Sequence, residues 1–190
     1  MTSVDLTYPA AAQSRIDAIA AALPRITTDR LTLRAPRLAD WPVLAPIWTT
    51  ERATHIGGPF SEDDAWLDFT HICAQWALRG FGGLTITLTE TNEVLGMVLL
   101  GRELKDPEPE LGWLLIESAE GLGYASEAAL ALRCEGVRLF GAGGFVSYIE
   151  ESNTRSISLA DRIGAVADKA RHPIAPEVLV YRHGKKGGAA

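Results

Sequence analysis

The chain has 190 residues, of which 47% are apolar and 22% are charged. This composition suits one globular domain with a hydrophobic core and excludes a disordered chain. The formal net charge of −6 argues against a nucleic-acid-binding surface, which would need a basic stripe. The N-terminus lacks the basic and apolar regions of a signal peptide, and no run approaches the ~20 apolar residues of a membrane span. We therefore expect a cytoplasmic protein with no nucleic-acid or membrane partner.

The cysteines and histidines give no indication of a metal site. Cys73 and Cys134 fall in segments that we interpret as helices, each on a face with other apolar residues. Neither they nor the four histidines have the spacing of metal ligands. We expect the cysteines to be small buried side chains in a reducing compartment, and we predict no metal.

The N-terminal part of the chain predicts a helical extension and then a first strand. Residues 11–23 have helical character with small side chains, and Pro24 ends this segment. We assign residues 1–25 to an N-terminal helical extension. Residues 26–36 alternate apolar and polar side chains, which predicts a strand.

Two helices are predicted next. Asp40 is typical of an N-cap and predicts a helix through Trp48. Ser61, with Asp64 three residues later, resembles a capping box at the start of a second helix, which ends at Gly80. One face of this second helix is apolar, with Trp66, Phe69, Cys73 and Trp76 at spacings of three and four.

Three strands follow, joined by a turn and an acidic loop. Residues 83–90 and 93–102 alternate in hydrophobicity on either side of Asn92, a typical turn residue. The loop at 103–110 is acidic and is interrupted by prolines. Residues 110–116 are apolar on both faces, which indicates a strand in the centre of a sheet.

The last third of the chain predicts a long helix, two strands and a short helix. A stripe of small and apolar residues marks the long helix, and the glycines at 141–144 end it. Residues 145–150 and 177–183 predict strands. Between them lies the short helix, with Asn153 as its cap and Gly164 as its end.

The segment between the strand at 110–116 and the long helix is the clearest indication of chemistry. Gly121 and Gly123 lie where the strand gives way to the helix. Backbone N–H groups at a helix N-terminus bind phosphate, and glycine lets the phosphate approach them. The alternative is a tight connection that needs glycine for a positive φ and nothing more. No Walker string is present, and the third position of a Rossmann fingerprint is Ser126, so both nucleotide motifs are excluded.

Two separate motifs carry a family resemblance. EGLGYASEAALAL begins at Glu120, and NTRSISLADRIGA begins at Asn153. Together they resemble the GNAT superfamily of acyl-CoA N-acetyltransferases, specifically its Rim-type branch, which is named for ribosomal-protein N-terminal acetylation. The segments TDRLTLRAPRLAD and VLGMVLLG fit the same branch, and the resemblance covers residues 26 to about 183. The matching residues are Gly121, Gly123, Tyr124, Ala125, Glu127, Ala128, Asn153, Ser156 and Gly164.

The resemblance implies an α/β fold with a mixed central β-sheet, splayed open between the strands at 110–116 and 144–149 and covered by helices on both faces. It implies that acetyl-CoA binds in this gap, with its pantetheine arm on the first of these strands and its pyrophosphate on the amides of residues 121–126. The implied cofactor-binding residues are Trp113, Leu114, Leu115, Gly121, Leu122, Gly123, Tyr124, Ala125, Ser126 and Asn153.

The implied reaction moves an acetyl group from acetyl-CoA to a primary amine by direct attack in a ternary complex. A carboxylate can take the proton of the amine. We predict Glu110 as this base, with Glu103 and Glu150 as alternatives. The competing interpretation of Glu110 is a surface carboxylate that ends a loop.

The acid for the leaving thiolate is predicted to be Ser156, or else a water held by Asn153. Many relatives use a tyrosine four residues before the glycine that corresponds to Gly164, and this chain has Ala160 there. Capping of the short helix alone would also explain Asn153 and Ser156.

Glu120 is a second departure from the family pattern. It stands where relatives usually have Gln or Arg, and in this branch often Trp. A carboxylate there is expected to repel the diphosphate unless it turns to solvent, so we expect weakened affinity for acetyl-CoA. Together with Ala160, Glu120 favours an alternative function, a non-catalytic CoA-binding or interaction module on the same fold.

The acceptor and the assembly remain open at this stage. A protein N-terminus, a polyamine, an aminoglycoside or another small amine could serve, and the acidic loop at 103–110 would suit a cationic acceptor. We predict one acyltransferase domain over 26–183 and a flexible tail over 184–190. The extension could pack against a partner, so a homodimer is kept as an alternative to a monomer.

Overall fold

The computed structural model describes residues 7–173 and 175–184. The start of the predicted extension and nearly all of the predicted tail, residues 185–190, lie outside the described residues. Within the described part, no helix is long and apolar enough to cross a membrane.

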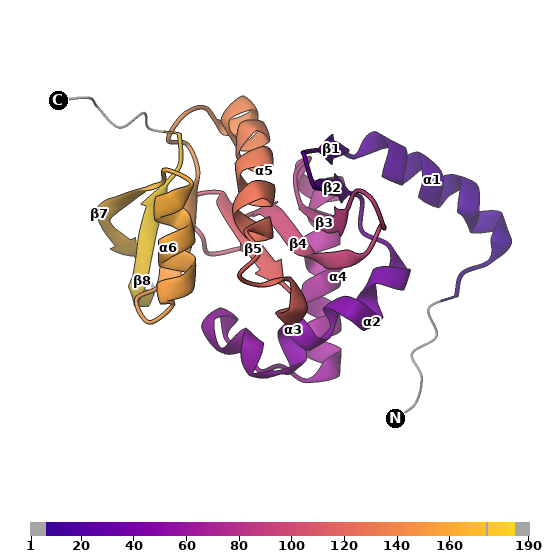
Figure 1. Ribbon diagram of the computed structural model, residues 1–190, viewed down its shortest axis with the longest axis horizontal. Helices are drawn as coiled ribbons and strands as arrows, with labels where there is room; N and C mark the ends of the chain where they lie inside the picture. The colour runs from indigo at the N-terminus through magenta and orange to yellow at the C-terminus, as the bar shows by residue number, and fades with distance from the viewer. Residues whose placement is uncertain (1–6, 174, 185–190) are drawn as a thin grey trace.

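A mixed sheet of eight strands forms the centre of the described chain (Figure 1), in the order β1-β2-β3-β4-β5-β6-β8-β7. β5 and β6 run parallel, and the other neighbouring pairs are antiparallel. The strands are β1 (Ile26–Thr27), β2 (Leu31–Arg34), β3 (Gly83–Leu88), β4 (Val94–Gly101), β5 (Glu110–Leu115), β6 (Val146–Glu150), β7 (Val166–His172) and β8 (Ala175–Arg182).

Helices cover both faces of the sheet. On one face, α5 (Tyr124–Phe140) packs across β5, β4 and β2, and α6 (Thr154–Arg162) lies beside it (Figure 1). On the other face lie α2 (Trp41–Leu44), α3 (Pro46–Thr49) and α4 (Glu62–Arg79). Short 3₁₀ helices complete the chain: η1 (Ala10–Ala12), η2 (Leu38–Asp40), η3 (Glu51–Ile56) and η4 (Glu117–Ala119). The predicted α/β architecture with a mixed sheet between two helical layers is confirmed.

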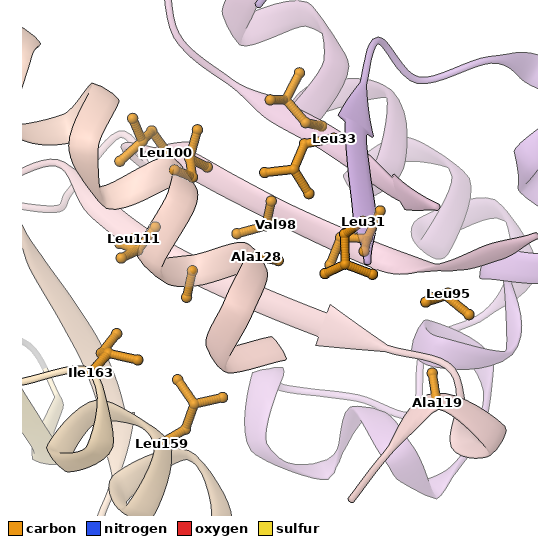
Figure 2. Close-up of a cluster of buried hydrophobic side chains, with 14 of the residues drawn as sticks. Leu31, Leu33, Leu95, Val98, Leu100, Leu111, Ala119, Ala128, Leu159 and Ile163 are labelled. Carbon is orange, nitrogen blue, oxygen red and sulfur yellow. The ribbon is translucent and has the colours of Figure 1, made fainter. Parts of the chain in front are cut away.

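Each face of the sheet has its own hydrophobic core, as the alternation of apolar residues along the strands requires. Figure 2 shows the core under α5, where Leu31, Val98 and Leu111 of the sheet meet Ala128 of α5 and Leu159 of α6. Burial of each of these leucines contributes roughly 1.5–3 kcal/mol. The other core is built on aromatic side chains, namely Trp41, Trp48 and Phe69, packed against Met97 of β4.

The sheet opens between β5 and β6. These strands are paired at one position, Glu110 with Val146, and they part beyond it. β5 is instead held by β4 along its whole length. At Gly96 of β4 (φ +155°) a Cβ atom would lie 2.1 Å from the carbonyl oxygen of Leu114, so this close approach of the two strands requires glycine. The predicted splay is therefore present. Beyond Glu110, β5 is paired with β4 on one edge and has no partner on the other among the described strands.

The helix predicted from Asp40 through Trp48 is wrong in two respects. The segment forms two short helices, because Pro46 has no N–H to continue the first one. Asp40 does not cap either helix with its side chain. It is buried, and its carboxylate accepts hydrogen bonds from Arg34 (2.7 and 2.8 Å) and from Thr85 Oγ1 (2.8 Å).

The two predicted caps are confirmed, and the prediction of two buried cysteines is not. The caps at Ser61 and Asn153 are confirmed, because their side-chain oxygens accept from the N–H groups of Asp64 and Ser156 (both 3.1 Å). The expectation of two buried cysteines is wrong for Cys134, which is exposed on α5. Cys73 is half-buried, and burial raises the pKa of its thiol to about 12.

The strand β7 and the N-terminal helix lie at opposite edges of the sheet (Figure 1). β7 was not predicted, because its residues, VADKARH, are mostly polar and exposed. It is an edge strand held by β8. The predicted N-terminal helix is α1 (Gln13–Ala22); it has no buried residue and lies at the periphery beyond β1 (Figure 1). The division of the chain into this extension and a domain over 26–183 stays a prediction.

Replacement of Asp40 by alanine should strongly destabilise the protein. Arg34 is 8% exposed and would lose both of its bonds to the carboxylate, leaving a buried charge without its partner. We expect the free energy of unfolding to fall by about 3–5 kcal/mol in Asp40→Ala, measured by urea denaturation. The matched control is Glu135→Ala, which breaks the pair of Glu135 with the exposed Arg138 of α5 and should cost less than about 1 kcal/mol. Equal losses in the two variants would contradict a structural role for the Asp40 pair.

Candidate active site

The parting of β5 and β6 opens a cleft of about 1200 Å³. Its walls come from β5, the turn before α5, β6, α6 and the 3₁₀ helix η3. Most of the residues predicted from the sequence line this one cleft: Glu110, Trp113, Leu114, Leu115, Gly121, Gly123, Ala125, Ser126, Asn153 and Ser156. Leu122 and Tyr124 are the predicted cofactor residues whose side chains are not part of the lining.

The turn before α5 has the geometry of an anion-binding helix start. Gly121 (φ +75°) and Gly123 (φ +82°) both have left-handed backbone, which favours glycine. Gly123 is the N-cap of α5, and no side chain in the described chain caps this end. The first amides of α5 therefore keep their N–H groups available to a ligand in the cleft.

Arg30 fastens the turn from outside the cleft. Its Nη1 donates to the Leu122 carbonyl oxygen (3.0 Å), and its Nε donates to Glu127 (2.7 Å). Its guanidinium lies 4.6 Å from the ring centroid of Tyr124. Thr28 Oγ1 also donates to Glu127 (2.6 Å). Three residues of the glycine motif, Leu122, Tyr124 and Glu127, thus have a structural role. They hold the turn against the connection between β1 and β2.

Glu110 lies where β5 and β6 separate, at the bottom of the gap. One of its carboxylate oxygens accepts from the Tyr148 N–H (3.3 Å). Burial, with a smaller contribution from the nearby carboxylates of Asp106 and Glu103, raises the pKa of Glu110 to about 7. A carboxyl group with such a pKa can accept a proton near neutral pH. Glu110 is thus not an ordinary surface carboxylate.

The alternative bases also line the cleft, but each has a histidine partner. Glu103 lies 3.1 Å from His71 Nε2, and Glu150 lies 2.9 Å from His55 Nδ1. Neither is placed at the point where the strands part. Glu110 is therefore the carboxylate best positioned for the role predicted from the sequence.

Ser156 and Trp113 meet across the gap between α6 and β5. Trp113 Nε1 donates to Ser156 Oγ (3.3 Å). Because an indole N–H can only donate, Ser156 Oγ is the acceptor in this contact and its own hydrogen is free to be donated elsewhere. Ala160, four residues further along α6, is fully buried against Ile149 and Tyr181. Ala160 has no hydroxyl and is not among the residues that line the cleft, whereas Ser156 lines it.

Glu120 is in neither of the two positions considered from the sequence, unpaired beside the diphosphate site or turned to solvent. It neither turns to solvent nor faces the turn unpaired, because its two carboxylate oxygens bond Arg52 of η3 and Arg155 of α6. Arg52 and Arg155 were both missed in the sequence. Arg155 is two residues after Asn153 and could have been noted, but nothing local connects Arg52 to a carboxylate 68 residues away.

Comparisons with known proteins identify the family of the chain. The sequence profile of the acetyltransferase (GNAT) domain matches residues 30–166. An uncharacterized N-acetyltransferase, p20 of Bacillus licheniformis, is 30% identical over 142 residues, which cover 72% of this chain and 79% of that protein. The structure of an acetyltransferase from Agrobacterium tumefaciens is 40% identical with a TM-score of 0.80, over 85% of this chain and 94% of the other.

A more distant structure shows the same fold. RimL, a ribosomal L7/L12 alpha-N-protein acetyltransferase solved with coenzyme A, is 19% identical with a TM-score of 0.63, over 84% of this chain and 97% of the other. The profile match covers most of this chain and includes both motifs up to Val166. The chain therefore belongs to the GNAT acetyltransferase family and is an acetyl-CoA-dependent N-acetyltransferase.

Proposed function

We propose that the protein transfers the acetyl group of acetyl-CoA to a primary amine by direct attack, with both substrates bound in the cleft between β5 and β6. One observation carries this proposal. The glycine turn, the unpaired part of β5, Glu110 and Ser156 all line a single cleft. A donor on the turn and an amine near Glu110 would therefore meet in one space.

The donor is held mainly by backbone groups. β5 leaves its pairing with β6 beyond Glu110, so peptide groups near Trp113, Leu114 and Leu115 can bond the amides of the pantetheine arm. The Leu115 carbonyl oxygen already accepts from Arg52. The diphosphate lies on the amides of residues 121–126 at the positive end of α5. Positioning of the thioester beside the amine supplies a large share of the rate.

The reaction needs two proton transfers, one from the attacking amine and one to the leaving thiolate, and we assign each to a different side chain. Glu110 takes the proton of the attacking amine, because its pKa of about 7 leaves much of it ionised at neutral pH. Ser156 gives a proton to the thiolate as coenzyme A leaves, because its hydroxyl hydrogen is not used by Trp113. Asn153 holds Ser156 in place through the cap bond to its N–H.

The acceptor is a primary amine of a protein N-terminus or of a small molecule, as in the Rim-type branch. Glu103 and Asp106 lie near Glu110 in the cleft lining, and these three carboxylates suit an acceptor with positive charge. We propose residues 26–183 as the catalytic domain. Residues 1–25 lie outside this proposed domain.

Gly121→Ala should weaken acetyl-CoA binding, with Gly80→Ala as its matched control. Both glycines have φ near +75° and open space where a Cβ would lie, but only Gly121 lines the cleft. Both variants should lose about 1–2 kcal/mol of unfolding free energy from left-handed strain. Only Gly121→Ala should raise the dissociation constant, by roughly fivefold, since its methyl group holds the phosphate off the amides. Calorimetric titration measures this difference, and equal affinities would remove the turn from the cofactor site.

Glu110→Gln should lower turnover at least about tenfold and leave the dissociation constant of acetyl-CoA unchanged. In the wild-type protein, kcat/KM should rise as the pH passes through about 7, because Glu110 accepts a proton only after losing its own. The pH profile of Glu110→Gln should lack this rise. Unchanged turnover would exclude Glu110 as the base.

Glu110→Gln should also change how stability depends on pH, which tests the raised pKa of Glu110 independently of activity. The pKa of Glu110 is higher in the folded protein, about 7, than the usual 4.5, so the folded state binds the proton more tightly. The protein should therefore lose stability as the pH rises from about 4.5 to about 7. Glu110→Gln should remove this contribution, which thermal unfolding at several pH values would show. A pH dependence of stability identical to that of the wild type would contradict the raised pKa.

Ser156→Ala should reduce kcat by about tenfold with little effect on stability. The cap bond of α6 uses the Ser156 N–H, which alanine retains. Steady-state kinetics with saturating acetyl-CoA would measure the loss. Full activity in this variant would mean that solvent protonates the leaving thiolate.

A further inference from the structure

An ion-pair cluster joins three walls of the cleft beside the glycine turn. Glu120 immediately precedes Gly121, and its carboxylate bonds Arg52 from η3 and Arg155 from α6. Two guanidinium groups around one carboxylate leave a net positive charge at this point. A second bridge runs parallel to it, where Arg162 of α6 donates to Ser126 Oγ of α5 (3.2 Å). Arg155 and Arg162 are two helical turns apart and so lie on one face of α6.

These bridges cross the space that a diphosphate on the turn would enter. Glu120, Ser126, Arg155 and Arg162 all line the cleft, together with Gly121 and Gly123. A diphosphate bound to the amides of the turn would lie beside the Glu120 carboxylate and compete with it for the same guanidinium groups. Arginine binds phosphate and carboxylate with the same planar pair of donors, so one anion can replace the other.

The two arginines of the cluster differ in how firmly they are held. The side chain of Arg52 is 20% exposed, and its Nη2 also donates to the Leu115 carbonyl oxygen (2.9 Å) at the end of β5. Arg155 is 69% exposed, and Glu120 is its only hydrogen-bonding partner among the described residues. Arg155 can therefore turn from Glu120 to another anion without breaking a backbone contact, whereas Arg52 stays anchored.

We propose that Arg155 is a cofactor-binding residue that exchanges Glu120 for a phosphate of acetyl-CoA, and that Glu120 is its counter-ion in the free enzyme. The inference rests on the proposed binding of the diphosphate at the glycine turn. Glu120 then acts as an internal competitor. It holds α6 against the turn before the cofactor arrives, and it remains neutralised by Arg52 after Arg155 has moved.

A double-mutant cycle between Glu120 and Arg155 tests this exchange. The dissociation constant of acetyl-CoA would be measured by calorimetry for the wild type, Glu120→Gln, Arg155→Ala and the double variant. Glu120→Gln should tighten binding about threefold, because the competitor is removed. Arg155→Ala should weaken binding about threefold in the wild-type background and about tenfold in the Glu120→Gln background, where Arg155 no longer has to leave a partner.

The opposite coupling would overturn the proposal. If Arg155 only shields Glu120, Arg155→Ala should have no effect once Glu120 is glutamine. If the two residues are independent, Arg155→Ala should have the same effect in both backgrounds, which also contradicts an exchange. Arg138→Ala is the matched control, since Arg138 is an exposed arginine of α5 paired with Glu135, and it should leave the dissociation constant unchanged. A wild-type protein that does not bind acetyl-CoA would overturn the proposed function itself, and the exchange with it.

Discussion

The parting of β5 from β6 beyond Glu110 is the constraint on which the rest of the site depends. A sheet normally pairs its backbone groups along both edges of an inner strand, and unpaired groups in a partly buried place are costly. Here β4 holds one edge of β5 and β8 holds one edge of β6, while the facing edges are joined at one residue pair. The carbonyl oxygens of Leu111 and Leu115 accept from Ser147 Oγ and Arg52, and the remaining donors and acceptors on this edge of β5 are ones that a pantetheine arm can satisfy.

The cleft has a different charge at its two ends. Beside the glycine turn, the positive end of α5 and the arginines of the Glu120 cluster favour an anionic donor. At the other end, around Glu110, two carboxylates that line the cleft have histidine partners: Glu103 with His71 and Asp106 with His172. Burial in this acidic surrounding is what raises the pKa of Glu110. The separation of charge orders the two substrates, with phosphates at one end and the amine at the other.

Sequence patterns predicted the parts of this arrangement that local forces determine. Alternation of apolar residues predicted β3 and β4, and Asn153 and Gly164 marked the ends of α6, because caps and turns are set within a few residues. β7 could not be predicted from its polar residues, because its pairing with β8 is what makes it a strand. Asp40 was wrongly predicted as a cap, because the sequence does not show that the fold buries it between Arg34 of β2 and Thr85 of β3. The Glu120 cluster was missed for the same reason, since tertiary contacts alone bring Arg52 and Arg155 to it.

Hydrogen exchange of the backbone amides, with and without acetyl-CoA, tests the central claim most directly. If the cofactor fills the gap between β5 and β6, peptides that cover 112–115 and 121–126 should exchange more slowly when it is bound. Residues 166–170 of β7 lie at the far edge of the sheet and do not line the cleft, so they should be unaffected. Protection of β7 with no change at β5 or the glycine turn would contradict the account, because the cofactor would then bind somewhere other than the gap.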